Sequence, residues 1–282
     1  IGVGGLYMQK RLFAGINYFN GVRSDIIGLN KSQQSTIGGG FMSYSNMGKV
    51  TNSGIEGAIN WKDRVGGFIY NIGLNITWSK NKLQEWNDIN YPDSYTNLIC
   101  KPTDAMMGYR ALGLFGKDVP LAGHSNQYLG AYKEGDIAYA DLNNDNRIDE
   151  RDKEMLGNSF PRTTIGIEVD LRYKQWGLYL LGVAETGVSK WLSNSYYWNK
   201  GEDKYSAATL DRYHPTENPQ GTYPSLTTRG GDNNFRYSTF WLEKANFFRM
   251  KNVELSYTLP NKFSSSVFQN IRFFARGTNL FV

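Results

Sequence analysis

Apolar and polar side chains alternate along several segments of the chain, most regularly between Thr163 and Glu185. Successive side chains of a β-strand point to opposite faces, so an alternating segment has one apolar and one polar face. In the first arm the apolar positions are Ile165, Ile167, Val169, Leu171 and Tyr173, and the positions between them are Gly166, Glu168, Asp170 and Arg172. Residues 174–177 supply a turn, after which Leu178, Leu180, Gly182 and Ala184 mark a returning strand. The segment therefore predicts a β-hairpin.

The same pattern predicts further strands at 2–9, 12–19, 49–62, 68–79, 247–259 and 271–282. The segments between strands run alternately short and long, with long polar excursions at 20–46, 80–161 and 188–240. The second excursion contains one short strand-like patch near 109–115. No segment has the pattern of an amphipathic helix of three turns. A chain of strands joined in this way is all-β.

The strands of a soluble β-sandwich show the same alternation, so alternation alone does not distinguish a soluble protein from a membrane protein. Two further features favour a membrane barrel. Alternately short and long connections are typical of up-and-down membrane barrels. Arms of about ten residues or more exceed ordinary globular strands and match a tilted bilayer crossing. We therefore expect residues 1–282 to be part of one antiparallel up-and-down transmembrane β-barrel with long extracellular loops. The apolar faces would point to membrane lipid and the polar faces to the lumen.

Composition and charge narrow the functional classes. Aromatic residues make up 15% of the chain, as in barrels with aromatic girdles. We expect a girdle from the aromatic residues near strand ends, although the same residues could be ordinary cross-strand packing partners: Tyr18, Trp61, Trp78, Tyr173, Trp176 and Tyr257. The net charge of +5 is mild and its Lys and Arg residues are scattered, which argues against nucleic-acid binding. The two histidines lie in separate excursions without a catalytic motif, so we expect no enzyme.

Residues 141–152 have the spacing of a twelve-residue calcium loop. The candidate ligands are Asp141, Asn143, Asp145, the carbonyl of Arg147, Asp149 and Asp152. Position six, normally Gly, is Asn146, and Asn is the next most tolerant residue of positive φ. Since no helical pattern flanks the loop, bound Ca²⁺ would be structural. The alternative is a solvated loop of Asx turns that binds nothing.

A second candidate site is the aromatic stretch 191–198, expected to be exposed together with 85–98. Its aromatic residues are Trp191, Tyr196, Tyr197 and Trp198. Flat aromatic rings suit stacking on sugar faces or packing against a partner protein. The alternative, equally open at this stage, is that the rings pack the excursion against itself.

Four collinear stretches resemble motifs of the barrel of SusC/RagA-type TonB-dependent outer-membrane transporters: Asn46–Glu56, Gly135–Pro161, Phe247–Pro260 and Ile271–Phe281. The resemblance implies the C-terminal portion of such a barrel, incomplete at both ends, with the plug domain, the earlier strands and the closing strand outside this chain. It also implies a plugged barrel of roughly 22 strands in the outer membrane of a Gram-negative bacterium. The family imports oligosaccharides or peptides, is energised through TonB and works with a SusD-like surface lipoprotein.

Two other functions fit parts of the pattern. A secreted or cell-surface glycan-binding β protein with a dockerin-like calcium loop would be soluble in buffer alone. A small passive porin would conduct without a plug or energy coupling. The transporter hypothesis instead predicts dependence on detergent and a lipoprotein partner.

Overall fold

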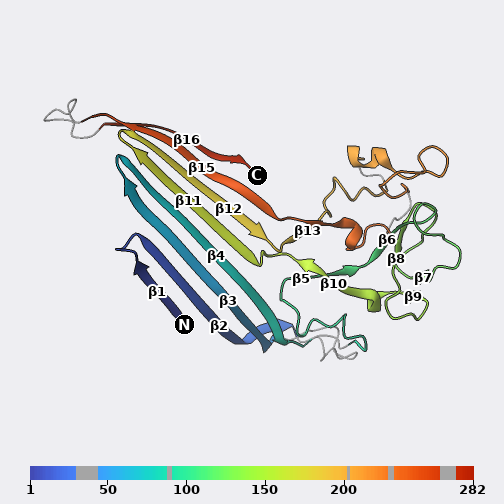
Figure 1. Ribbon diagram of the computed structural model, residues 1–282. Helices are drawn as coiled ribbons and strands as arrows, with labels where there is room; N and C mark the ends of the chain where they lie inside the picture. The colour runs from blue at the N-terminus through green and yellow to red at the C-terminus, as the bar shows by residue number, and fades with distance from the viewer. Residues whose placement is uncertain (30–43, 88–90, 202–203, 228–231, 261–270) are drawn as a thin grey trace.

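The computed structural model describes residues 1–29, 44–87, 91–201, 204–227, 232–260 and 271–282. Eight strands form one antiparallel sheet in the order β1-β2-β3-β4-β11-β12-β15-β16 (Figure 1). Their bounds are β1 Gly2–Tyr7, β2 Leu12–Leu29, β3 Tyr44–Val65, β4 Phe68–Glu85, β11 Thr163–Tyr173, β12 Trp176–Thr186, β15 Phe247–Thr258 and β16 Arg272–Phe281. Each strand pairs with its neighbours along the sheet, and β1 and β16 are the two edges. The predicted all-β, up-and-down antiparallel fold is confirmed, as an open segment of a barrel wall.

Three strands are longer than the sequence pattern predicted. β2, β3 and β4 contain 18, 22 and 18 residues, so much of the expected polar passage at 20–46 is strand. Residues 30–43 of that passage lie outside the described residues. The pairing of β2 with β3 continues from Asn20↔Ser53 to Leu29↔Tyr44 through two register shifts. Beyond an apolar belt both faces of a strand meet water, so backbone pairing persists while the apolar alternation that marked the strand fades.

The apolar positions of neighbouring strands fall into register across the sheet. Leu74 of β4 lies between Ile59 of β3 and Ile167 of β11. These three side chains are 42%, 51% and 40% exposed. The position after Leu74, Asn75, pairs with Gly166 on the opposite face. One face of the sheet is thus apolar and exposed, as in a barrel wall that contacts lipid.

Aromatic side chains border this apolar face at both ends. At the turn end, five strands contribute one row of neighbouring aromatics: Phe68, Tyr173, Trp176, Tyr257 and Phe273. At the opposite end, Tyr18 pairs with Ile55, which pairs with Trp78. Ten residues of β4 separate the two ends, roughly 33 Å along the strand, which suits a tilted crossing of the hydrocarbon layer. Trp61 pairs with Ile72 inside the belt, so it is not at either border.

Both expected roles of the border aromatics are present in one pair. Trp176 and Tyr257 lie at the turn end, and their ring centroids are 4.9 Å apart across the strands. Trp176 is nevertheless 52% exposed, so cross-strand packing leaves much of its surface free for an interface.

The two long excursions after β4 and β12 fold together into one unit, which we call the loop module (residues 86–162 and 187–246, Figure 1). The described residues of the module form four small two-stranded sheets and three 3-10 turns. The strand pairs are β5 Ala105–Tyr109 with β10 Lys153–Asn158, β6 Ala111–Leu114 with β8 Ile137–Tyr139, β7 Asn126–Gln127 with β9 Arg147–Ile148, and β13 Ser189–Trp191 with β14 Leu242–Lys244. The 3-10 turns are η2 Glu150–Asp152, η3 Ala207–Asp211 and η4 Thr239–Trp241. The strand-like patch expected near 109–115 corresponds to the end of β5 together with β6.

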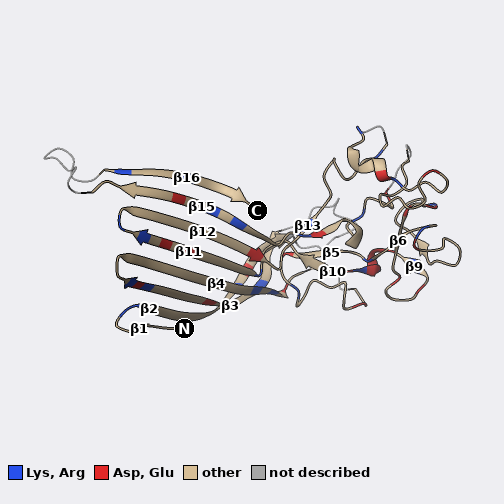
Figure 2. Cartoon of the chain, turned by 45° about the horizontal axis from the view of Figure 1, so that its top comes forward, with Lys and Arg blue, Asp and Glu red and all other residues tan. Residues whose placement is uncertain are grey.

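The buried apolar core lies in the loop module rather than under the sheet. Its members are Tyr109, Leu114, Leu129, Ile137, Tyr139, Ile148, Tyr213, Tyr223, Phe235 and Trp241. Among the described residues of the eight strands, Leu83 is the one buried apolar side chain. Charged residues gather at strand ends and over the loop module, and the middle of the sheet carries few of them (Figure 2). No helix in the described parts of the chain is long and apolar enough to cross a membrane.

A buried polar cluster holds the two excursions together. Asp136 accepts hydrogen bonds from Asn234 Nδ2 at 2.8 Å and from Ser225 Oγ at 2.6 Å. Asn234 Oδ1 in turn accepts the backbone N–H of Ile137 at 2.9 Å, and Asn233 Nδ2 donates to the Ile137 carbonyl at 3.0 Å. Asn233 and Asn234 are almost completely buried. Both asparagines belong to the second excursion, and their side chains form hydrogen bonds with residues of the first excursion.

A buried ion pair of the loop module contacts the sheet through Asn81 of β4. Arg162, which immediately precedes β11, places Nη2 2.8 Å from Asp104 Oδ1, and both side chains are largely buried. Asn81 of β4 donates to the same carboxylate at 3.1 Å. Burial raises the pKa of Asp104, but the hydrogen bonds from Arg162, Asn81 and the Phe160 backbone outweigh it, so the pKa lies below its usual value. The carboxylate is thus held in its charged form at the joint.

The face assignment predicts different costs for arginine at adjacent positions. Leu74→Arg should lower the free energy of unfolding of the intact protein in a bilayer by roughly 2–4 kcal/mol, because a cation would face the hydrocarbon. Asn75→Arg is the matched control and should lack this penalty, since its neighbour Gly166 leaves room on the polar face. Denaturant titration in lipid vesicles measures both, and an equal or reversed order would contradict the assignment.

The polar cluster predicts a local weakening of the loop module. Asn234→Ala should leave the buried Ile137 N–H without an acceptor, which costs about 1–3 kcal/mol. Amide hydrogen exchange of the intact protein should speed up in β8 and leave β4 and β11 unchanged. The exposed Asn126→Ala is the control. Uniform exchange across the module would contradict a clamp at this position.

Candidate functional site

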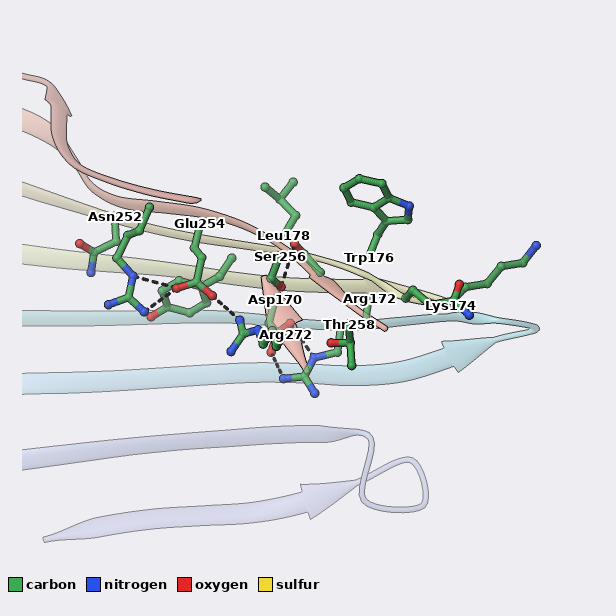
Figure 3. Close-up of a pocket in the computed structure, with 14 residues that line it drawn as sticks. Asp170, Arg172, Lys174, Trp176, Leu178, Asn252, Glu254, Ser256, Thr258 and Arg272 are labelled. Carbon is green, nitrogen blue, oxygen red and sulfur yellow. Dashed lines mark hydrogen bonds and ion pairs between the residues drawn. The ribbon is translucent and has the colours of Figure 1, made fainter. Parts of the chain in front are cut away.

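A recess of about 550 Å³ lies on the polar face of the sheet, near the turn between β11 and β12 (Figure 3). Its wall comes from β11, β12, β15 and β16. The charged residues that line it are Asp170, Arg172, Lys174, Glu254, Arg272 and Arg276. The four cationic and two acidic side chains give the recess a net positive charge. We call it the ion-paired recess.

Glu254 is the centre of this recess. Its side chain is 5% exposed, and it forms ion pairs with Arg272 and Arg276 of the neighbouring strand. Arg276 Nε lies 2.8 Å from Glu254 Oε2. Register explains the Arg276 contact, because Glu254 pairs directly with Arg276; Arg272 pairs with Thr258, and its long side chain extends back along the strand to Glu254. Charge-assisted hydrogen bonds of this kind fix the geometry of both partners.

The other charged pair of the recess lies within β11. Arg172 donates to both oxygens of Asp170, at 3.1 and 2.8 Å. All three arginines remain about half exposed or more toward the recess. The recess thus offers fixed charges and hydrogen-bond donors. It contains no His, Cys or other nucleophile–base pair among its lining residues.

The alternation of the first hairpin arm placed Asp170 and Arg172 on the polar face but did not identify the recess. Glu254 and Arg272 belong to different predicted strands, and only the register of β15 with β16 shows that they meet. Arg272 and Glu254 do fall within the motif-bearing stretches, and that was the one available signal.

The structure places the predicted calcium ligands in the segment that follows β8, with Arg147 in β9 and Asp152 in η2. Asn144 and Asn146 adopt positive φ of 60° and 61°, so Asn146 takes the conformation expected of the usual Gly. Asp141 accepts backbone N–H groups of Asn144 and Asn146 at 2.7 and 2.8 Å. Asn143 Nδ2 donates to Asp145 at 2.9 Å. The loop is thus a run of Asx turns.

Arginines and backbone amides already occupy its carboxylates. Arg151 lies 3.2 Å from Asp145, and Arg147 lies 3.3 Å from Asp149. Asp152 accepts the N–H groups of Leu142 and Asp149, both at 2.8 Å. Burial, helped by the charges of Asp141 and Asp149, raises the pKa of Asp152 despite these hydrogen bonds. No group of three or more acidic, His or Cys side chains in the described residues is placed to hold a metal.

In this arrangement the carboxylates of Asp145 and Asp149 are paired with arginines, and that of Asp152 accepts backbone amides, in place of a cation. To bind one, the loop must release the two arginines from Asp145 and Asp149. Arg147 has a second contact, since its guanidinium lies 4.2 Å from the centroid of the Tyr128 ring. The calcium site stays a prediction.

The aromatic stretch is less exposed than predicted. Tyr196 is 48% exposed, but Trp191, Tyr197 and Trp198 are half-buried, because they pack against the core or against each other. Tyr197 accepts a hydrogen bond from the Tyr223 hydroxyl through its carbonyl at 2.7 Å. A binding role for the four residues stays a prediction, and the expected exposure holds for Tyr196 but only in part for the other three rings.

One residue of this aromatic site was missed. The Tyr237 ring packs at a tilt against Trp191 and Trp198, with ring centroids 5.0 and 5.4 Å apart. It comes from the segment before η4, which has no alternation that would place it near 191–198. Only the pairing of β13 with β14 brings the two segments together.

No protein-family model matches the chain. The chain is 23% identical over 257 residues to TonB-dependent receptor P3 of Formosa agariphila, a match that covers 83% of this chain and 24% of the relative. The chain thus spans about a quarter of that relative's length.

Solved structures agree on the fold. The RagAB peptide importer in its closed-closed state superposes with a TM-score of 0.75 and 16% identity over 99% of this chain and 31% of that one. The RagAB peptide transporter gives 0.74 and 17%, again over 99% and 31%. The named relatives are receptors and importers, not enzymes, which agrees with the prediction that this chain is no enzyme. Both comparisons confirm the resemblance drawn from the four motifs: the chain is similar to a portion of a SusC/RagA-like TonB-dependent transporter and has the fold of that portion.

Proposed function

We propose that the chain forms barrel wall and extracellular loops of an active transporter in the outer membrane of a Gram-negative bacterium. The observation that carries this proposal is the apolar face shared by eight strands in register, with exposed Ile59, Leu74 and Ile167 at its middle. A secreted glycan-binding protein would have to cover such a face. Membrane lipid covers it in a barrel.

The two ends of the sheet indicate its orientation. The described turns at one end are short, whereas the loop module occupies the other end (Figure 1). In outer-membrane barrels the short turns face the periplasm and the long loops face outward. The ion-paired recess then lies on the lumen side near the periplasm, and the loop module lies at the extracellular mouth.

The remaining elements of the proposal concern the whole transporter. The substrate is an oligosaccharide or a peptide, and TonB energises import through a part of the protein outside this chain. A SusD-like lipoprotein covers the mouth and contacts the loop module. Support comes from the fold shared with RagAB, a peptide importer, and from the similarity to a TonB-dependent receptor.

Uptake by intact cells tests the transporter proposal. Cells that carry the whole protein should accumulate its substrate, and a protonophore or loss of TonB should abolish accumulation. Purification from the outer membrane in detergent should recover a lipoprotein in stoichiometric amount. Accumulation that continues without TonB and without a proton gradient would favour a passive porin. Full solubility without detergent would favour a secreted protein.

We also propose that the 141–152 loop binds Ca²⁺ as a structural ion, on the strength of its ligand spacing. Asp141, Asn143, Asp145, Asp149, Asp152 and the carbonyl of Arg147 would hold the ion. Release of Arg147 and Arg151 would free two carboxylates for it. Bound Ca²⁺ would then neutralise these carboxylates in place of the two arginines.

Chelation tests the calcium proposal. Protease cleavage of the intact protein between Gly135 and Gly157 should rise after chelator treatment and fall again with millimolar calcium, while the barrel stays folded. Asp141→Asn should remove this dependence, and Asp211→Asn, in the other excursion, should not. Arg151→Gln should lower the calcium concentration needed, because a competing cation is gone. Cleavage that ignores calcium in all variants would show that the loop binds none.

A further inference from the structure

We propose that Lys80, Lys82 and an apolar groove on the lipid face of the sheet bind one phosphorylated glycolipid of the outer leaflet. The phosphate lies between the two ammonium groups, and an acyl chain lies in the groove. The inference rests on the proposed function, from which it takes the orientation of the barrel with the loop module outside. It goes beyond the general contact of a barrel wall with lipid, because it assigns one class of lipid to one position.

Strand β4 places both lysines on the lipid face, just beyond the aromatic border at its outer end (Figure 1). β4 pairs with β3 without a register shift from Trp78 to Lys82, so Lys80 and Lys82 share the face of Trp78. The side chain of Asn81 points to the opposite face, where it donates to Asp104 of the loop module at 3.1 Å. The lysines therefore lie outside the barrel, at the level of the lipid headgroups.

The charges of the two lysines are available to a ligand. Both side chains are exposed, and none of the ion pairs between described residues includes either of them. Their partners on β3, Ser53 and Thr51, are neutral. Lys80 Nζ lies 5.6 Å from the centroid of the Trp78 ring, which keeps this ammonium group close to the aromatic border. Two neighbouring ammonium groups suit a phosphate.

A groove of about 380 Å³ on the same face continues from the lysines toward the turn end of the sheet. Its apolar walls include Val3, Tyr7, Ile16, Ile59, Leu74 and Ile76. Gly57 forms part of its floor, because it pairs with Ile16 on one side and Ile76 on the other and has no side chain to fill the space between them. Ile76 and Lys80 are four residues apart on β4, roughly 13 Å along the strand. An acyl chain that descends from the lysines therefore enters the groove.

The lysines determine which lipid fits. The groove alone accepts any hydrocarbon chain, whereas two ammonium groups at its outer end select a lipid with an anionic headgroup. Their position beside the loop module selects the outer leaflet. Glycolipids that carry phosphate on a sugar are the anionic lipids of that leaflet in Gram-negative bacteria. Phosphatidylglycerol, an anionic lipid of the opposite leaflet, is the comparison that tests this choice.

Native mass spectrometry of the intact detergent-solubilised transporter tests the site. The probes are diphosphorylated lipid A, the same lipid after phosphatase treatment, and phosphatidylglycerol. Diphosphorylated lipid A should bind most tightly. The double variant Lys80→Gln with Lys82→Gln should weaken its binding roughly tenfold or more, and should bind the phosphatase-treated lipid as the unaltered protein does. Ala14→Phe, which fills the groove, should weaken the binding of both forms of lipid A.

Matched controls exist for both variants. Lys10→Gln with Lys62→Gln makes the same change of charge at the turn end of the sheet, where both lysines are exposed. Ala275→Phe adds the same ring to the lipid face of β16, where Ala275 pairs with Leu255. Both controls should bind diphosphorylated lipid A as the unaltered protein does. Heat-modifiable migration on gels confirms that each variant is a folded barrel.

Three results would overturn the lipid site. They are binding that does not depend on the phosphates, stronger binding of phosphatidylglycerol, and unchanged affinity in either the double lysine variant or Ala14→Phe. TonB-dependent uptake by the same cells separates these results from failure of the transport proposal. Uptake that requires TonB, together with any of the three results, refutes the lipid site alone.

Discussion

The register between strands is the constraint on which the rest of the structure depends. Side chains alternate with period two, so a slip of one residue between β4 and β11 would exchange Leu74 for Asn75 against Ile167. The apolar belt, its aromatic borders and the ion-paired recess all require the same register. The recess shows this most directly, since Glu254 meets Arg276 only as its direct partner across β15 and β16.

The sheet and the loop module place their apolar residues in different surroundings. The sheet exposes its apolar residues on one face, whereas the loop module buries its own in an interior core. Asp104 and Arg162 form a buried ion pair where the two parts meet, and Asn81 of the sheet donates a hydrogen bond to the same carboxylate. A buried carboxylate with three hydrogen-bond donors keeps this joint specific, because loss of Arg162 would leave an uncompensated charge.

The sequence pattern located the strands wherever one face of the strand lies in apolar surroundings. It located the β11–β12 hairpin and the β3–β4 turn because alternation there is strict. The pattern predicted β2 and β3 to be shorter than they are, because their outer halves carry polar residues on both faces while the backbone pairing continues. The interior of the loop module stayed invisible, since contacts such as Asp136 with Asn234 join segments about a hundred residues apart and leave no local period. The same holds for the site residues. Trp191 could be selected by its residue type, whereas the position of Tyr237 near it follows only from the fold.

The core of the loop module also has a consequence for the order of assembly. Its residues come from both sides of the β11–β12 hairpin, since Tyr109 and Tyr139 precede it and Trp241 follows it. The core therefore cannot close until segments from both excursions have come together around the hairpin. Long-range closure of this kind is slow.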